Sequence, residues 1–172
     1  MPVYRFEKLD AKHDKASFQS DSEILNRWFR EQAGQQVRSR TAVVYVLIHI
    51  PSNIIAGFYT LSTASIASAE FSDDWVRTLK LPRYNTLPVL LLRRLAVDKK
   101  FVKQGLGRLL VVDAVRIAEK TILEVGAIGL VVDAKDDKAV AFYKRLGFWQ
   151  FPGNKSKLLM PAKDFSAFFA AG

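Results

Sequence analysis

The chain has 172 residues, enough for one ordinary domain with a sizeable core. It contains no cysteine and only two histidines, which excludes disulfides, thiolate metal sites and cysteine nucleophiles, and we expect no catalytic metal. Its 26 Lys and Arg residues against 17 Asp and Glu give a net charge of +9. Such an excess is typical of proteins that meet nucleic acid, a phosphorylated cofactor or an acidic partner, although a protein can also be basic without any such partner. No secretory signal or membrane-spanning apolar segment is visible, so we expect a cytoplasmic protein without a membrane partner.

The first third of the chain predicts a helix followed by a β-hairpin. Ser20 and Glu23 have the spacing of a capping box, and apolar residues then recur at helical intervals. This predicts a helix over about 21–33 with Ser20 as its N-cap, and a second short helical piece toward residue 40. The β-branched and aromatic residues of 41–50 predict a strand, 51–53 a turn, and 54–62 the returning strand.

The rest of the chain alternates between predicted strands and helices. A short helix is expected over 73–79, and Pro82 and Pro88 are expected to bracket a loop. Strands are predicted over 90–97, 127–133, 148–151 and 157–160, and a helix over 137–146 that ends at Gly147. Another helix opens near Gly105, and its expected apolar face consists of Leu106, Leu109, Leu110, Ala114 and Ile117. This order predicts an α/β fold, with a central mixed sheet flanked by helices, and a single domain over 1–172.

A glycine turn stands where the strand over 90–97 leads into a helix. It reads Gln104-Gly105-Leu106-Gly107. A helix start offers unpaired backbone N–H groups with a partial positive charge, and glycine lets a phosphate approach them closely. A pyrophosphate site is therefore one interpretation, and an ordinary tight turn is the other. A Rossmann fingerprint is excluded because Leu110 occupies the place of its third glycine, and no P-loop sequence exists.

A second motif follows the strand that ends near Asp133, and reads Ala-Val-Ala-Phe-Tyr-Lys-Arg-Leu-Gly-Phe over 139–148. Together with the glycine turn, it resembles the GNAT superfamily of acetyl-CoA-dependent N-acetyltransferases over about 41–160. One departure is that Val102 and Lys103 stand where the family usually has Arg or Gln and then Gly, which puts coenzyme affinity in question. The resemblance implies acetyl-CoA as co-substrate, with Tyr143 as the acid that protonates the departing thiolate. A core tyrosine is the alternative for Tyr143.

The same resemblance implies the remaining site residues. Cofactor contacts are expected from Leu95, Ala96, Val97, Lys103, Gln104, Gly105, Leu106, Gly107, Arg108 and Phe142. A backbone N–H near Val97 is expected to stabilise the oxyanion. No general base is assigned, and Asp98 and Glu70 are the available candidates.

A narrower resemblance points to the GNAT toxins of bacterial toxin–antitoxin pairs. It rests on Phe18, Ser20, Leu25 and Trp28, on Arg40-Thr41, on 57–62 (GFYTLS) and on 94–98 (RLAVD). It implies acetylation of the α-amino group of aminoacyl-tRNA, a small ribbon-helix-helix antitoxin as partner, and a possible homodimer. The alternatives are acetylation of a protein N-terminus, lysine or small amine, and a non-catalytic basic nucleic-acid-binding module.

Basic side chains are candidates for binding the RNA substrate, and for each single one an ordinary solvated surface charge is the alternative. They are Arg40, Arg77, Arg83, Arg93, Arg94, Lys144 and Arg145. Trp75, Tyr84 and Trp149 are interleaved with such residues, and aromatic rings beside arginine suit stacking on exposed bases. Because Arg93 and Arg94 are neighbours on a strand, one of them should face inward and meet an anion or a carboxylate.

Overall fold

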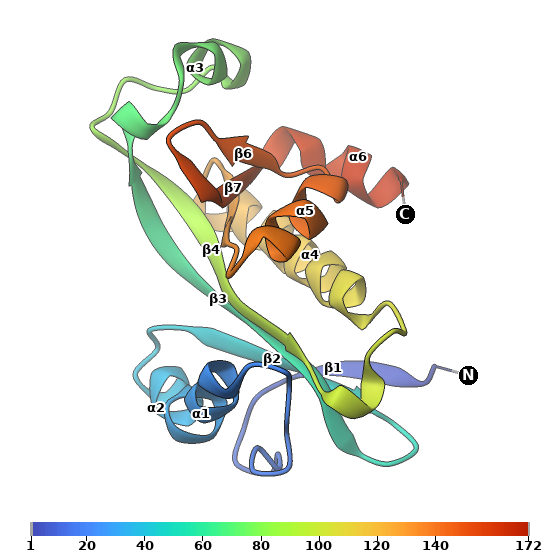
Figure 1. Cartoon of the computed structure of the whole chain (residues 1–172). Helices are drawn as coiled ribbons and strands as arrows, with labels where there is room; N and C mark the ends of the chain where they lie inside the picture. The colour runs from blue at the N-terminus through green and yellow to red at the C-terminus, as the bar shows by residue number, and fades with distance from the viewer. Residues whose placement is uncertain (1, 172) are drawn as a thin grey trace. The chain divides into compact units, whose positions relative to one another are not determined.

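The structure is a computed structural model that describes residues 2–171, and these residues group into two compact units. The first unit contains the residues up to Ser62 together with Arg93–Ala114, and the second contains Thr63–Leu92 together with the residues from Val115 onward. Seven strands hydrogen-bond in the order β1-β2-β3-β4-β5-β7-β6 (Figure 1). Since β4 and β5 pair in parallel and β5 and β7 pair antiparallel, the sheet is mixed, and the predicted fold class is confirmed.

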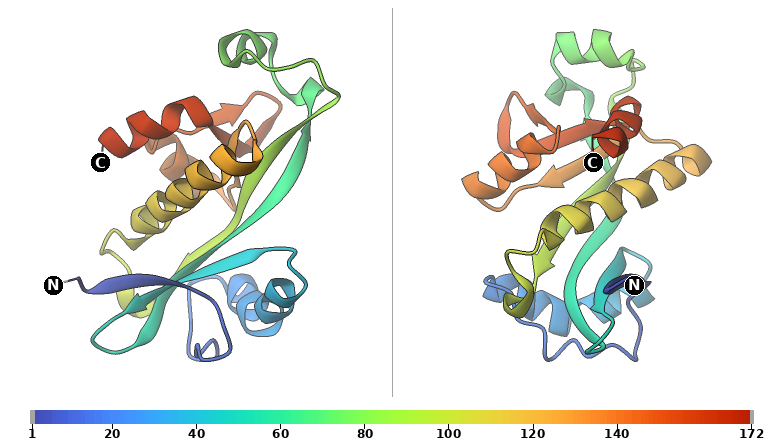
Figure 2. Two further views of the ribbon diagram at one scale, coloured as in Figure 1. Left: turned by 180° about the vertical axis from the view of Figure 1, so that it is seen from behind. Right: turned by 90° about the vertical axis from the view of Figure 1, so that its right-hand side faces the viewer.

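The first unit is built on an antiparallel meander of β1 (Tyr4–Lys8), β2 (Val43–His49) and the first part of β3 (Ile54–Ala67). Tyr4 pairs with His49 across β1 and β2. The helices α1 (Glu23–Glu31) and α2 (Ala33–Arg38) lie together beside β2 in both views of Figure 2. The ring of Phe29 stacks on that of Phe58, with centroids 4.2 Å apart and planes 4° from parallel, so α1 is anchored by aromatic packing.

The start of α1 differs from the prediction. Ser22, not Ser20, is the N-cap, and its Oγ accepts a hydrogen bond from the backbone N of Leu25 at 3.2 Å. Ser20 is buried, and its hydroxyl donates to Asn26 Oδ1 at 2.8 Å. The predicted cap is therefore wrong because the hydroxyl of Ser20 is engaged in a buried side-chain pair with Asn26.

The second unit combines part of β4 (Thr86–Val97) with β5 (Gly129–Asp133), β6 (Trp149–Phe151) and β7 (Asn154–Pro161). Its helices are α3 (Asp73–Leu79), α5 (Asp137–Arg145) and α6 (Phe165–Ala170). A Cβ atom on Gly129 would lie 2.3 Å from the carbonyl oxygen of Met160, so the close approach of β5 to β7 at this position requires glycine. Three single-turn 3-10 helices, at Ser68–Glu70, Lys99–Phe101 and Ala162–Asp164, complete the described chain.

Several predicted elements are confirmed, and others change. The helix over 73–79 has the predicted bounds, and Gly147 follows α5 with φ of 102°. Pro88 lies inside β4 rather than beside a loop, because it is the exposed residue between buried Leu87 and Val89 in an alternating strand.

Two further differences concern helices and strands. In α4 (Leu106–Val125), Leu106, Leu110 and Ala114 of the expected apolar face are buried and Ile117 is partly buried, whereas Leu109 is exposed. The other buried apolar positions are Val111, Val115 and Ala118, so the buried face is wider than predicted on one side. The strand β1 and the helix α6 were not predicted at all.

Candidate active site

The glycine turn of the first unit leads directly into α4. Lys103 and Gly105 both adopt left-handed backbone conformations, with φ of 63° and 75°. Helix α4 starts at Leu106, and its first turn contains no acidic residue. Because the residue before the helix is Gly105, no side chain at that place can cap the first N–H groups. These amides and the positive end of the helix dipole therefore suit a phosphate group.

A contact from β1 holds the side chain of this turn. Tyr4 Oη donates to Gln104 Oε1 at 2.7 Å, and the ring of Tyr4 lies 6.4 Å from that of Phe101 and 5.5 Å from that of His49. Since the oxygen of the Gln104 carboxamide is occupied, its NH2 group remains as a donor. Sequence reasoning missed this contact because β1 was not predicted, and a lone short strand gives little periodic signal.

The end of β4 that precedes the turn is fixed against β3 in the first unit. Ala96 is buried, whereas Leu95 and Val97 are partly exposed. A Cβ atom on Gly57 would lie 3.0 Å from the carbonyl oxygen of Ala96, so the glycine permits this close approach. The parallel pairing of β4 with β5 runs over Leu90–Leu92, and β4 continues from there to Val97.

The two general-base candidates both hold structural partners. Asp98 is 1% exposed, and its carboxylate accepts hydrogen bonds from the backbone N of Gln19 at 2.9 Å and of Lys100 at 2.8 Å. It therefore caps the 3-10 turn at Lys99–Phe101. Glu70, in the second unit, pairs with Lys157 Nζ at 2.8 Å. These contacts favour structural roles for both carboxylates.

Tyr143 belongs to the second unit and lies on α5. The helix is capped by Asp136, whose Oδ1 accepts from the backbone N of Ala139 at 2.8 Å. The ring of Tyr143 is 6% exposed and packs edge-on against Phe142 and Phe148, with centroids 5.1 and 5.3 Å apart. Burial raises the pKa of the Tyr143 phenol above its ordinary value of 10.0. The hydroxyl is thus protonated at neutral pH and can act as a proton donor.

The basic residues predicted to bind RNA are mostly exposed. Arg40 and Arg93 are exposed in the first unit, as are Arg77, Arg83, Lys144 and Arg145 in the second. Arg94 is only partly exposed, and its guanidinium lies 4.1 Å above the ring centre of Trp28. The expectation that one of the two strand arginines faces inward is therefore met by Arg94, but its partner is an aromatic ring rather than a carboxylate.

The aromatic residues predicted to stack on bases differ in their surroundings. Trp75 and Trp149 pack against each other, with ring centroids 5.5 Å apart, and Trp149 Nε1 donates to Asp164 Oδ2 at 3.0 Å. Both rings therefore belong to the packing of the second unit. Tyr84 is 67% exposed and remains available for stacking.

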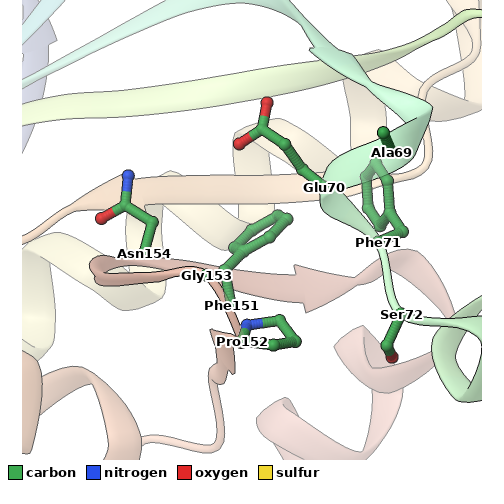
Figure 3. A pocket seen from close by; sticks show the side chains of 8 residues that line it. All are labelled: Ala69, Glu70, Phe71, Ser72, Phe151, Pro152, Gly153 and Asn154. Atoms are coloured by element: carbon green, nitrogen blue, oxygen red, sulfur yellow. The ribbon is translucent and has the colours of Figure 1, made fainter.

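A small cavity of the second unit, of about 330 Å³, is lined by the general-base candidate Glu70 but by none of the residues predicted to bind the cofactor or the RNA. Its walls come from the 3-10 turn at Ser68–Glu70 with the residues that follow it, and from the turn between β6 and β7, as Figure 3 shows. The buried rings of Phe71 and Phe151 lie 5.4 Å apart at this cavity. Within residues 2–171, no cluster of three or more His, Asp or Glu side chains could hold a metal ion. No helix in the same range is long and apolar enough to cross a membrane.

Comparison with known proteins places the chain in a family. A model of the acetyltransferase (GNAT) domain matches residues 42–150, which is more than half of the chain. The chain therefore belongs to the GNAT acetyltransferase family. The matched region includes β4, the glycine turn, α4 and the tyrosine-bearing α5.

Particular relatives cover nearly the whole chain. A tRNA-acetylating toxin of Mycobacterium tuberculosis is 30% identical over 160 residues, which cover 93% of each protein. The structure of AtaT complexed with acetyl-methionyl-tRNAfMet has 32% identity and a TM-score of 0.87, covering 96% of this chain and 99% of AtaT. An AtaT variant with one tyrosine replaced by phenylalanine, bound to the C-terminus of the antitoxin AtaR and to acetyl-CoA, has 29% identity and a TM-score of 0.81, covering 98% of this chain and 99% of that one.

Proposed function

We propose that this protein transfers the acetyl group of acetyl-CoA to the α-amino group of aminoacyl-tRNA and acts as the toxin of a toxin–antitoxin pair. The observation that carries the proposal is the similarity, over 96% of the chain, to AtaT in complex with acetyl-methionyl-tRNAfMet. The similar tRNA-acetylating toxin supports the same substrate. Action on aminoacyl-tRNA would place the protein in the cytoplasm, where translation occurs.

The glycine turn supplies the coenzyme contacts of the proposed site. The backbone N–H groups of Gln104–Arg108 bind the pyrophosphate of acetyl-CoA, because the start of α4 has neither a capping side chain nor an acidic residue in its first turn. The exposed side chains of Lys103 and Arg108 add positive charge. The main-chain groups of Leu95, Ala96 and Val97 bind the pantetheine arm, and Phe142 packs against it.

The proposed reaction needs no covalent enzyme intermediate. The substrate amine attacks the thioester carbonyl carbon, and a backbone N–H near Val97 stabilises the oxyanion. The carbon–sulfur bond then breaks, Tyr143 donates its phenolic proton to the departing thiolate, and a proton from water restores the phenol. An α-amino group has a pKa of about 7.7–8 against about 10.4 for lysine. A substantial fraction is therefore already neutral near pH 7, and the amine proton can pass to water.

Two kinds of macromolecular partner follow from the proposal. The exposed Arg40, Arg77, Arg83, Arg93, Lys144 and Arg145, together with the net charge of +9, suit the phosphates of a tRNA. A ribbon-helix-helix antitoxin would neutralise the enzyme, as supported by the structures of AtaT with AtaR. A homodimer remains part of the proposal.

The decisive experiment compares the wild-type protein with Tyr143→Phe on charged tRNA. We expect acetyl-CoA-dependent acetylation of aminoacyl-tRNA with release of free CoA thiol, and a fall of kcat by about 100-fold or more in the variant, because general acid catalysis contributes about 10²–10⁴-fold. The affinity for acetyl-CoA, measured by calorimetry, should be unchanged.

Other outcomes separate the alternatives. Equal activity on free polyamines or on peptide N-termini would favour a different acceptor amine. Absence of both acetyl-CoA binding and thiol release would leave a nucleic-acid-binding module without catalysis. Full activity of Tyr143→Phe would show that another group protonates the thiolate.

A further inference from the structure

We propose that a cavity beside α1 binds one nucleotide of the RNA substrate, with its base stacked on the guanidinium of Arg94. The inference rests on the proposed function, because it assumes that the acceptor amine is presented on an RNA. The cavity belongs entirely to the first unit and has a volume of about 390 Å³. Its lining residues are Glu23, Ile24, Arg27, Trp28, Gln32 and Arg94.

The guanidinium of Arg94 is a supported flat surface. Its Cζ atom lies 4.1 Å from the ring centre of Trp28. That indole is 6% exposed and stacks in turn on Phe58, with ring centroids 6.1 Å apart and planes 19° from parallel. The backbone N of Arg94 donates to Thr60 Oγ1 at 3.3 Å, which fixes the strand beneath the side chain. Since Arg94 lines the cavity and remains partly exposed, its other side can receive a base, as arginine planes do in RNA recognition.

The charge of Arg94 is not compensated by a carboxylate among residues 2–171. Burial, followed by the nearby charge of Arg93, lowers the pKa of Arg94. The one acidic residue of the cavity wall, Glu23, is already engaged with Arg30 at 3.2 Å and with Asn26. Arg27 is exposed at the same wall, and its charge is, after the hydrogen bond from Arg30, among the causes that lower the pKa of Glu23. Two cations against one carboxylate leave the cavity wall positive, and a phosphate group would compensate this excess.

These observations together favour a nucleotide over an acidic protein segment. Carboxylates would satisfy the two arginines, but they would leave the planar surface of Arg94 unused. A nucleotide uses both the charges and the plane, through its phosphate and its flat base. The two ligands therefore make opposite predictions for a substitution that keeps the charge and removes the plane.

Arg94→Lys is such a substitution, and Arg5→Lys on β1 is its matched control, since Arg5 is exposed and lies outside the cavity. The probe is a fluorescently labelled 12-nucleotide single-stranded RNA that ends in CCA, and binding is followed by anisotropy at several salt concentrations. Losing one stacked base should weaken RNA binding by about 5- to 100-fold. The slope of log K against log salt concentration should be unchanged, because the number of cations is unchanged. Trp28→Phe, which keeps a smaller aromatic ring against the guanidinium, should weaken binding to a smaller extent.

Thermal unfolding and acetyl-CoA affinity report whether each variant is folded. On aminoacyl-tRNA, Arg94→Lys should raise KM and leave kcat nearly unchanged. If its RNA affinity equals that of Arg5→Lys while both proteins are folded, the inference is wrong. It is also wrong if a polyglutamate peptide binds the wild type and Arg94→Lys with equal affinity and displaces the RNA from both. Failure of the wild type to acetylate aminoacyl-tRNA would refute the proposed function, whereas the RNA comparison would still decide the role of the cavity.

Discussion

Replacing Gly105 by glutamate is expected to weaken acetyl-CoA binding through charge alone, and Gly105→Gln is the control that isolates this effect. A Cβ atom at this position would meet no atom within 4 Å, so neither side chain is blocked sterically. Both variants share the cost of placing a non-glycine residue at φ of 75°, about 1–2 kcal/mol of folding free energy. They differ in one negative charge beside the amides of α4.

The size of the effect follows from Coulomb's law. For charges about 6 Å apart, with an effective dielectric constant of about 40, each pair of unit charges repels by about 1.4 kcal/mol. A pyrophosphate with roughly two charges would then be bound about 1.5–3 kcal/mol more weakly, or about 10- to 150-fold, once screening is included. Calorimetric titration with acetyl-CoA measures this ratio directly, and thermal unfolding should give the same stability for both variants.

The comparison can refute the reasoning. If Gly105→Glu and Gly105→Gln bind acetyl-CoA with equal affinity, the pyrophosphate does not lie at the start of α4. Equal affinity at high salt with a large difference at low salt would instead agree with the charge argument, since salt screens the repulsion.

Three further outcomes are expected. Ser20→Ala should lower the free energy of unfolding by about 1–3 kcal/mol, because it removes the buried hydrogen bond to Asn26. Ser22→Ala should lower it by about 1 kcal/mol, because the helix cap is lost. Urea unfolding in which only Ser22→Ala had an effect would contradict this ranking. Phe29→Ala should cost about 3–5 kcal/mol in the same assay, because a fully buried ring is lost, whereas Phe29→Leu should cost less. Hydrogen bonds from Arg5, His13 and Lys12 lower the pKa of Glu7 from 4.5 to about 2. The stabilisation of the folded state by these bonds is present above about pH 4.5 and is lost as the pH falls toward 2. Between these two pH values the free energy of unfolding should therefore fall by about 1 kcal/mol less in Glu7→Gln than in the wild type. Equal pH profiles for the two proteins would contradict this expectation.

Local signals in the sequence were sufficient for the elements that carry the family motifs. Gly147 ends α5 as its position after an amphipathic run indicates, and the helix over Asp73–Leu79 has the predicted bounds. The glycine turn before α4 was also located correctly, because glycine pairs with a following apolar run are a strong local signal. These features depend on neighbours close in sequence.

What could not be predicted depends on contacts between distant residues. The N-cap of α1 is Ser22 rather than the predicted Ser20, because the Ser20 hydroxyl is hydrogen-bonded to Asn26 in a buried pair. The strand β1 forms because β2 offers it an edge to pair with, and only this pairing brings Tyr4 to Gln104. The stacking of Arg94 on Trp28 likewise joins residues that are far apart along the chain, and no spacing rule reports it.

The division of the chain into two units restricts when each can fold during synthesis. The first unit needs Arg93–Ala114 as well as the residues up to Ser62, so the ribosome must translate a long intervening stretch before its last strand and the start of α4 exist. Because β3, β4 and α4 each contribute residues to both units, a fragment that keeps one unit would sever two strands and a helix. A nascent chain shorter than about 114 residues is therefore expected to remain sensitive to protease and to depend on chaperones.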